Sequence, residues 1–148
     1  MNTKYEFTGE TKIVYGRTLR RIKAIVAIGA TVAPGDIGGW IESENNLSVY
    51  GDAWVYGDAL VYGDARVCGN ARVCGKEDYM TFKNSWSSGR WFTYTASNQK
   101  WKVGCFYGTG DELVRKAYAD SELSGKCYEA IVRAVEAIEA AKESEVKE

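Results

Sequence analysis

The sequence predicts a mainly β protein, built around a short parallel β-helix with antiparallel strands beside it and α-helices at the C-terminus. Three observations predict this fold class. A six-residue pattern repeats through the middle of the chain, apolar and polar residues alternate in its flanks, and the apolar spacing becomes helical near the end. We expect one domain over residues 1–148, made of N-terminal strands (1–36), the repeat (37–77), an antiparallel meander (78–108) and C-terminal helices (109–143).

The first segment, residues 1–36, is expected to form short strands. Tyr5 and Phe7 alternate with polar residues, as in a strand with one buried face. The sequence Pro34-Gly35-Asp36 predicts a turn that leads into the repeat. The segment also carries a basic run, which consists of Arg17, Arg20, Arg21 and Lys23. These side chains either lie on a solvated strand edge or add positive charge to a binding cleft.

The repeat has the pattern Val-Tyr-Gly-Asp-Ala, which begins at Val49, Val55 and Val61, and related copies with cysteine in the second position begin at Val67 and Val73. Glycine and asparagine tolerate positive φ angles, so each Gly-Asp or Gly-Asn step predicts a sharp turn. Between the turns, alternating alanine and valine predict a short strand with one buried face. A chain that turns every six residues in one sense winds into a coil whose strands pair in parallel.

The same register extends back to residue 37, which gives six complete repeats and places Ile41 and Leu47 at the alanine position. The repeat resembles that of the hexapeptide-repeat, left-handed β-helix family, in which a small residue follows an aliphatic one four places on. This resemblance covers residues 37–75 and implies a left-handed sense, three hexads per coil, and trimers packed side by side. Six hexads make about two coils, and neighbouring strands lie only ~4.8 Å apart, so this triangular prism of coils would be too short to be stable alone. We therefore expect flanking segments or other subunits to cover it.

The segments after the repeat change from strands to helices. A meander is expected from strands at residues 79–82, 91–95 and 100–107, with a hairpin loop at 97–99. Asp111 opens a helix, and Gly125 is expected to separate it from a second helix. That second helix either forms a lid over one open end of the coil, which we favour, or a bundle that joins subunits; its expected apolar face carries Cys127, Ile131, Val135 and Ile138.

Histidine is absent from the whole chain. The hexapeptide-repeat resemblance implies two kinds of enzyme, acyltransferases with a histidine base and trimeric carbonic anhydrases with zinc on three histidines. We therefore expect no enzyme activity, no metal and no cofactor. A carboxylate could replace the base, which leaves an atypical acyltransferase-like enzyme as an alternative. Asp52, Asp58 and Asp64 are interpreted as turn residues rather than calcium ligands.

Composition suggests a cytoplasmic protein. The net charge of −1 gives no signal for nucleic acid or membrane binding, and the N-terminus lacks the apolar core of a secretory signal. We expect free thiols at all four cysteines, because their spacing matches no zinc template and the cytosol is reducing; they are Cys68, Cys74, Cys105 and Cys127.

Positions two and six of the repeat flank the inward valine and are expected to point outward. With 18 residues per coil, Trp54 would lie under Arg72. These side chains are either buried under the meander or in a subunit interface, or they line a cleft between subunits. In such a cleft, aromatic rings would stack on a planar ligand and arginines would pair with its phosphate or carboxylate. The predicted ligand-binding residues are Trp54, Tyr56, Tyr62, Arg66, Arg72, Arg20 and Arg21.

The whole chain also resembles a set of small proteins encoded by bacteriophages and prophages. The resemblance lies in the opening Tyr5-Glu-Phe-Thr-Gly-Glu, in Gly38-Gly-Trp-Ile-Glu-Ser-Glu-Asn-Asn-Leu, and in Gly104-Cys-Phe-Tyr-Gly-Thr-Gly-Asp-Glu-Leu. It implies a protein that acts against host antiviral defence. We predict a homo-oligomer, of three subunits, that sequesters a small anionic nucleotide-like ligand without catalysis. The alternatives are an inhibitor of a host defence protein, or a scaffold, and the acyltransferase-like enzyme.

Overall fold

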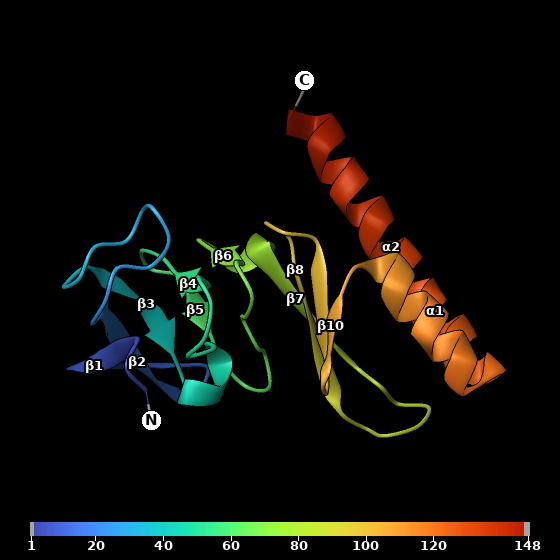
Figure 1. The fold of residues 1–148 in the computed structure, drawn as a ribbon, viewed down its shortest axis with the longest axis horizontal. Coiled ribbons are helices and arrows are strands. Elements are labelled where there is room, and N and C mark those ends of the chain that lie inside the picture. The colour runs from blue at the N-terminus through green and yellow to red at the C-terminus, as the bar shows by residue number, and fades with distance from the viewer. Residues whose placement is uncertain (1, 147–148) are drawn as a thin grey trace.

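The computed structural model describes residues 2–146, and its elements follow one another along the long axis of the molecule (Figure 1). The protein is mainly β, with mixed and antiparallel sheets and two C-terminal helices, as predicted. The strands are β1 (Tyr5–Val14), β2 (Arg17–Ala24), β3 (Ile37–Ile41), β4 (Trp54–Val55), β5 (Leu60–Val61), β6 (Arg72–Val73), β7 (Tyr79–Lys83), β8 (Trp91–Thr95), β9 (Lys100–Val103) and β10 (Phe106–Gly108). The helices are the 3-10 helices η1 (Glu44–Asn46) and η2 (Lys76–Asp78), followed by α1 (Gly110–Asp120) and α2 (Glu122–Val146).

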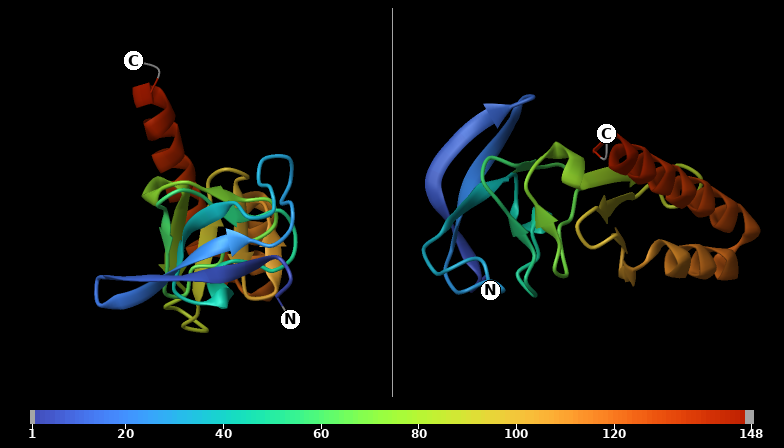
Figure 2. Two further views of the ribbon diagram at one scale, coloured as in Figure 1. Left: turned by 90° about the vertical axis from the view of Figure 1, so that its left-hand side faces the viewer. Right: turned by 90° about the horizontal axis from the view of Figure 1, so that it is seen from above.

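The N-terminal segment forms a long hairpin of β1 and β2. Its turn has positive φ angles at Tyr15 (52°) and Gly16 (74°), the combination that suits the right-handed twist of the two strands. β2 also pairs with β3, so the hairpin continues into the repeat as a sheet of order β1-β2-β3-β5. Figure 2 shows the turn of the hairpin extending beyond the rest of the molecule.

The repeat makes two circuits of the chain with parallel pairs on three sides. Ile41 pairs with Val61, Leu47 bridges to Val67, and Val55 pairs with Val73. The turns between them have positive φ angles at glycine, as the pattern predicts: 71° at Gly51, 56° at Gly57, 65° at Gly63 and 66° at Gly69. The predicted pair of Trp54 and Arg72, 18 residues apart, is confirmed.

The register of the first circuit differs from the prediction. Ile41 and Leu47 lie opposite Val61 and Val67, so they occupy the valine position rather than the alanine position. The chain therefore takes two extra residues between Leu47 and Val55, and Val49 is only partly buried. The buried Lys4 stabilises this wider corner, because its ammonium group donates a hydrogen bond of 2.9 Å to the carbonyl oxygen of Ser48.

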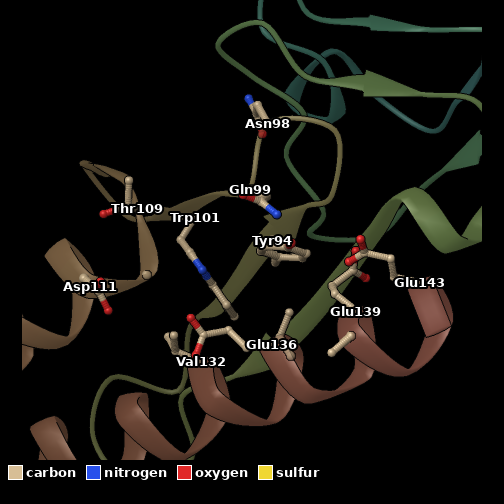
Figure 3. Close-up of a pocket in the computed structure, with 13 residues that line it drawn as sticks. Tyr94, Asn98, Gln99, Trp101, Thr109, Asp111, Val132, Glu136, Glu139 and Glu143 are labelled. Atoms are coloured by element: carbon tan, nitrogen blue, oxygen red, sulfur yellow. The ribbon is translucent and has the colours of Figure 1, made fainter.

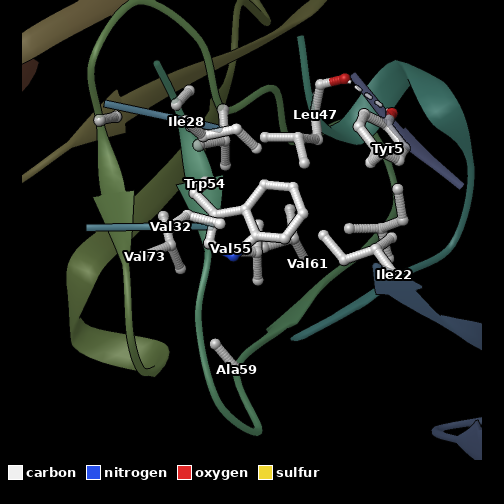
Figure 4. Close-up of a cluster of buried hydrophobic side chains, with 14 of the residues drawn as sticks. Tyr5, Ile22, Ile28, Val32, Leu47, Trp54, Val55, Ala59, Val61 and Val73 are labelled. Carbon is white, nitrogen blue, oxygen red and sulfur yellow. Dashed lines mark hydrogen bonds between the residues drawn. The ribbon is translucent and has the colours of Figure 1, made fainter. Parts of the chain in front are cut away.

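The valine and alanine rows fill the first of two hydrophobic cores (Figure 4). Tyr5, Ile22 and Ala24 from the N-terminal hairpin close this core on one side. Gly38 and Gly39 allow β3 to lie directly on the next circuit, because a Cβ atom at Gly38 would come within 2.7 Å of the Trp54 indole. The N-terminal strands thus cover part of the apolar surface of the two circuits, as expected.

The second core lies between the meander and the two helices. The predicted meander is confirmed as a sheet of order β10-β9-β8-β7, although its last strand is divided at a turn where Gly104 has a φ of 55°. The helices pack on this sheet, as Figure 1 shows, and not over the end of the repeat, so the predicted lid is wrong. The repeat is covered by the sheet itself, where the Tyr79 hydroxyl donates a hydrogen bond of 2.8 Å to the carbonyl oxygen of Leu60.

The boundary and the buried face of α2 also differ from the prediction. The break falls at Ser121, and Gly125 lies inside α2, where a Cβ atom would come within 2.2 Å of the Tyr118 ring. Gly125 therefore serves the close packing of α2 on α1 instead of ending a helix. The buried face of α2 carries Tyr128, Val132 and Val135.

Candidate functional site

The structure does not bring the seven predicted ligand-binding residues into one site, and it removes Trp54 from the surface. The prediction that Trp54 binds a ligand is wrong, because its side chain is 1% exposed in the first core. Its ring lies 6.3 Å from the ring of Tyr5, edge to face, where the N-terminal hairpin covers this side of the repeat. The repeat alone leaves this side open, and the hairpin that closes it could not be placed from the repeat pattern.

The two predicted arginines of β2 differ in how they are held. Arg20 is exposed, and its guanidinium lies 5.1 Å from the Phe7 ring. Arg21 donates hydrogen bonds to the carbonyl oxygens of Gly38 (3.0 Å) and Gly57 (3.1 Å) and lies over the Trp40 ring. Arg21 thus ties the hairpin to the repeat, which makes it a structural residue.

Tyr56 and Arg72 do come together, in a polar pocket of about 480 Å³ between the loop after β2, the repeat and the β8–β9 loop. The Tyr56 hydroxyl lies 2.9 Å from the hydroxyl oxygen of Thr31, and Asp52 also lines the pocket. Arg66 lies elsewhere, in a pocket that includes Lys102. The four repeat residues Tyr56, Tyr62, Arg66 and Arg72 therefore occupy three different pockets.

The remaining predicted residue, Tyr62, lines a pocket of about 460 Å³ that combines aromatic rings with cations. It lies where the turn end of the hairpin, a corner of the repeat and the edge of the meander meet. We call it the Tyr62 pocket; it is lined by Arg17, Tyr62, Gly63, Asp64, Lys76, Tyr79, Met80, Thr81 and Trp91.

Arg17 is positioned at the Tyr62 pocket by Glu42. A carboxylate oxygen of Glu42 accepts hydrogen bonds of 2.8 Å both from the Arg17 guanidinium and from the backbone N–H of Gly63. These contacts lower the pKa of Glu42, with the Gly63 N–H contributing most and Arg17 adding to it. The guanidinium lies 5.5 Å from the centre of the Tyr62 ring and has further N–H groups for an anion.

Tyr79 forms a fixed aromatic wall of the same pocket. Its hydroxyl is held by the carbonyl oxygen of Leu60, and burial, with a smaller contribution from Tyr62, raises its pKa to about 12. Tyr79 is therefore neutral at physiological pH. Trp91, the first residue of β8, adds a ring that is nearly half exposed, and Lys76 adds a second cation. This arrangement suits a ligand with a planar group and a negative charge.

Sequence reasoning identified Tyr62 and named Arg17 only as part of the basic run, and it missed Lys76, Tyr79 and Trp91. Arg17 belongs to the basic run, where nothing distinguishes it from its neighbours. Lys76, Tyr79 and Trp91 follow the repeat, and only the folding of the meander against the repeat brings them to Tyr62. The two features of the sequence that pointed to this pocket were the aromatic second position of the repeat and the basic run.

Within residues 2–146, the structure contains no group of three acidic, cysteine or histidine side chains that could hold a metal ion. In the same part of the chain, no helix combines the length and apolar character that crossing a bilayer requires. No family model matches the sequence, and no curated protein matches it.

Proposed function

We propose that this protein binds a small anionic, nucleotide-like ligand in the Tyr62 pocket without transforming it, and that in the host cytoplasm this sequestration inhibits an antiviral defence pathway. The observation that carries the proposal is the meeting of Arg17 and Lys76 with three aromatic rings in one pocket. The resemblance to phage proteins supports the cellular role.

The charge of the pocket favours an anion. Two cations line it against one carboxylate, Asp64, and Asp64 is exposed to solvent. Glu42 accepts one N–H of Arg17 and orients the guanidinium toward the pocket, which reduces the entropy lost when a ligand binds. A phosphate group paired with Arg17 would leave a base free to stack on Tyr62, Tyr79 or Trp91.

Replacing Arg17 by alanine is expected to weaken binding of the preferred nucleotide by about 10- to 100-fold, because a charge-assisted hydrogen bond contributes ~1.5–3 kcal/mol. Calorimetry with a panel of cyclic and linear nucleotides would identify that ligand on the wild-type protein. Arg66→Ala is the matched control, since Arg66 is an exposed arginine of the repeat that lies outside the pocket. The absence of heat for every nucleotide, or an equal loss in both variants, would contradict the proposal.

We also propose that the two circuits form a left-handed β-helix and that the protein assembles as a trimer. Parallel pairs on three sides support the β-helix, and the family resemblance supports its hand and the trimer. The hairpin turn offers an apolar surface for association, because Ile13 and Tyr15 are 75% and 83% exposed.

Native mass spectrometry of the full chain is expected to show a trimer, and the double variant Ile13→Glu/Tyr15→Glu is expected to shift it to smaller species. The control is Tyr50→Glu, which changes an equally exposed tyrosine outside the hairpin. A wild-type monomer would contradict assembly. It would instead favour the second candidate function, a protein–protein inhibitor that uses the same hairpin turn, and a host protein retained in fixed ratio would support that function.

A further inference from the structure

The polar pocket of about 480 Å³ that contains Tyr56 and Arg72 shares no residue with the Tyr62 pocket. We call it the Tyr56 pocket. Most of its lining side chains are polar, and they include those of Thr31, Asp52, Tyr56, Asn70, Arg72 and Asn98. Its size is that of a small-molecule site, and its one acidic and one basic side chain make its lining neutral overall. The Tyr56 pocket therefore differs in charge from the Tyr62 pocket.

One wall of the Tyr56 pocket is a loop, residues 29–31, that is anchored in the first core. The loop is closed by hydrogen bonds in both directions between the backbones of Ile28 and Val32, at 2.9 and 3.2 Å. Both of these residues are buried in the first core. The Thr31 hydroxyl oxygen also lies 2.9 Å from the hydroxyl oxygen of Tyr56. The loop is thus tied to the repeat at its base and near its tip.

The opposite wall, the β8–β9 loop, is tied to the repeat by side chains. The Asn98 Nδ2 donates a hydrogen bond of 2.9 Å to Oδ1 of Asn70, and the Ser97 hydroxyl oxygen accepts one of 2.7 Å from the backbone N–H of Arg72. Both walls are therefore held by contacts within the protein, which lowers the entropy that a ligand must overcome on binding.

The two charged side chains of the Tyr56 pocket make no salt bridge. Within residues 2–146, no ion pair includes Asp52 or Arg72. The acidic pocket between the meander sheet and α2 is different (Figure 3), because its Glu136 and Asp111 both pair with Arg133, at 2.8 and 3.2 Å. The Tyr56 pocket thus offers one negative and one positive group to a ligand.

The backbone places these two groups far enough apart for a ligand to lie between them. The N–H of Asp52 donates a hydrogen bond of 3.0 Å to the carbonyl oxygen of Gly69, and Arg72 pairs with Trp54. The two residues therefore lie on adjacent segments and are offset by two positions, which separates their Cα atoms by roughly 8 Å at ordinary strand spacings. A zwitterion has a charge that complements each group, and its charge-assisted hydrogen bonds are stronger than those of a neutral ligand.

We propose that the Tyr56 pocket binds a free α-amino acid with a polar, uncharged side chain, represented by glutamine. Arg72 pairs with its α-carboxylate, and the Asp52 carboxylate accepts hydrogen bonds from its α-ammonium group. The side chain of the amino acid finds donors and acceptors in Thr31, Tyr56 and Asn70, which are polar and uncharged. This site is additional to the proposed nucleotide site and does not depend on it.

Saturation-transfer difference NMR of the full chain with L-glutamine, L-glutamine amide and N-acetyl-L-glutamine tests the proposal. The amide lacks the α-carboxylate and the acetylated compound lacks the α-ammonium group. We expect glutamine to bind more tightly than either analogue by about 10-fold or more, because each analogue loses one charge-assisted contact. Arg72→Gln is expected to remove the preference for glutamine over its amide, and Asp52→Asn the preference over the acetylated compound. A purely structural role of these side chains would not change the two preferences separately.

The repeat supplies a matched control for each variant. Arg66 and Asp58 occupy the same positions of neighbouring hexads as Arg72 and Asp52, and both lie outside the Tyr56 pocket. Arg66→Gln and Asp58→Asn are therefore expected to bind all three compounds like the wild type.

The absence of a glutamine signal, equal binding of the three compounds to the wild type, or the same loss of preference in the controls would overturn the proposal. Binding of a neutral sugar such as glucose in place of glutamine would also overturn it. Arg17→Ala is expected to retain glutamine binding, so failure of the nucleotide proposal and failure of this one are distinguishable. Should a pocket variant unfold, the preferences of the wild type among the three compounds still decide the outcome.

Discussion

Trp54→Ala is expected to lower the free energy of unfolding by about 3–5 kcal/mol, the range for deleting a fully buried tryptophan. The indole is 1% exposed and packs where three segments meet, against Tyr5 of the hairpin and close to Gly38 of β3. The cavity left by alanine could not collapse easily, because the paired strands on both sides hold their spacing. Urea-induced unfolding, followed by far-ultraviolet circular dichroism, measures the change.

Tyr50→Ala is the matched control for Trp54→Ala. Tyr50 also belongs to the repeat and was expected to point outward, and it is 81% exposed. Its replacement is expected to change stability by less than about 0.5 kcal/mol. Equal effects of the two substitutions would mean that Trp54 is not a core residue and would reopen its assignment to a ligand site.

Asn46→Ala is expected to lower the free energy of unfolding by about 3 kcal/mol, because several buried backbone groups lose their partner at once. The Asn46 side chain is fully buried and connects the two circuits. Its Oδ1 accepts from the backbone N–H groups of Glu42 (3.1 Å) and Ser43 (2.9 Å), and its Nδ2 donates to the carbonyl oxygens of Gly63 (3.1 Å) and Ala65 (2.8 Å). Thermal and urea unfolding measure the loss.

Asn46→Asp separates the two halves of this network. Aspartate keeps the acceptor for Ser43 but turns a second oxygen toward the carbonyl oxygens of Gly63 and Ala65, so we expect a loss at least as large as with alanine. The neighbouring Asn45 is exposed, and Asn45→Ala is expected to be close to neutral. A stable Asn46→Asp protein would show that the link between the circuits is not needed.

The repeat was predictable because its signal is local. A glycine with a positive φ angle at each turn and a valine at every sixth residue can be recognised without knowledge of the rest of the chain. Val55, Val61, Val67 and Val73 are all fully buried. The prediction failed at Ile41 and Leu47, where the pattern was extended through Gly38-Gly39 and Asn45-Asn46, none of which has a positive φ angle. There the turn is made by η1 and fixed by the buried Asn46, which in sequence is indistinguishable from the exposed Asn45.

The arrangement of the flanks was less predictable, since it depends on contacts between distant segments. The meander strands followed from their alternation, but nothing local showed that they, and not α2, would cover the repeat. The candidate site shows the same limit. Tyr62 could be selected from the repeat, whereas Arg17 and Trp91 are separated by 74 positions and come together only in the folded chain.

The pairing of the circuits restricts how the length of this protein can change in evolution. Deleting or duplicating a single hexad would move every later residue to a different side of the stack and would break pairs such as Trp54 with Arg72. Gain or loss of three hexads together would keep each side intact and only lengthen or shorten the prism. Irregular insertions are compatible with the fold at corners, as the two extra residues before Val55 demonstrate.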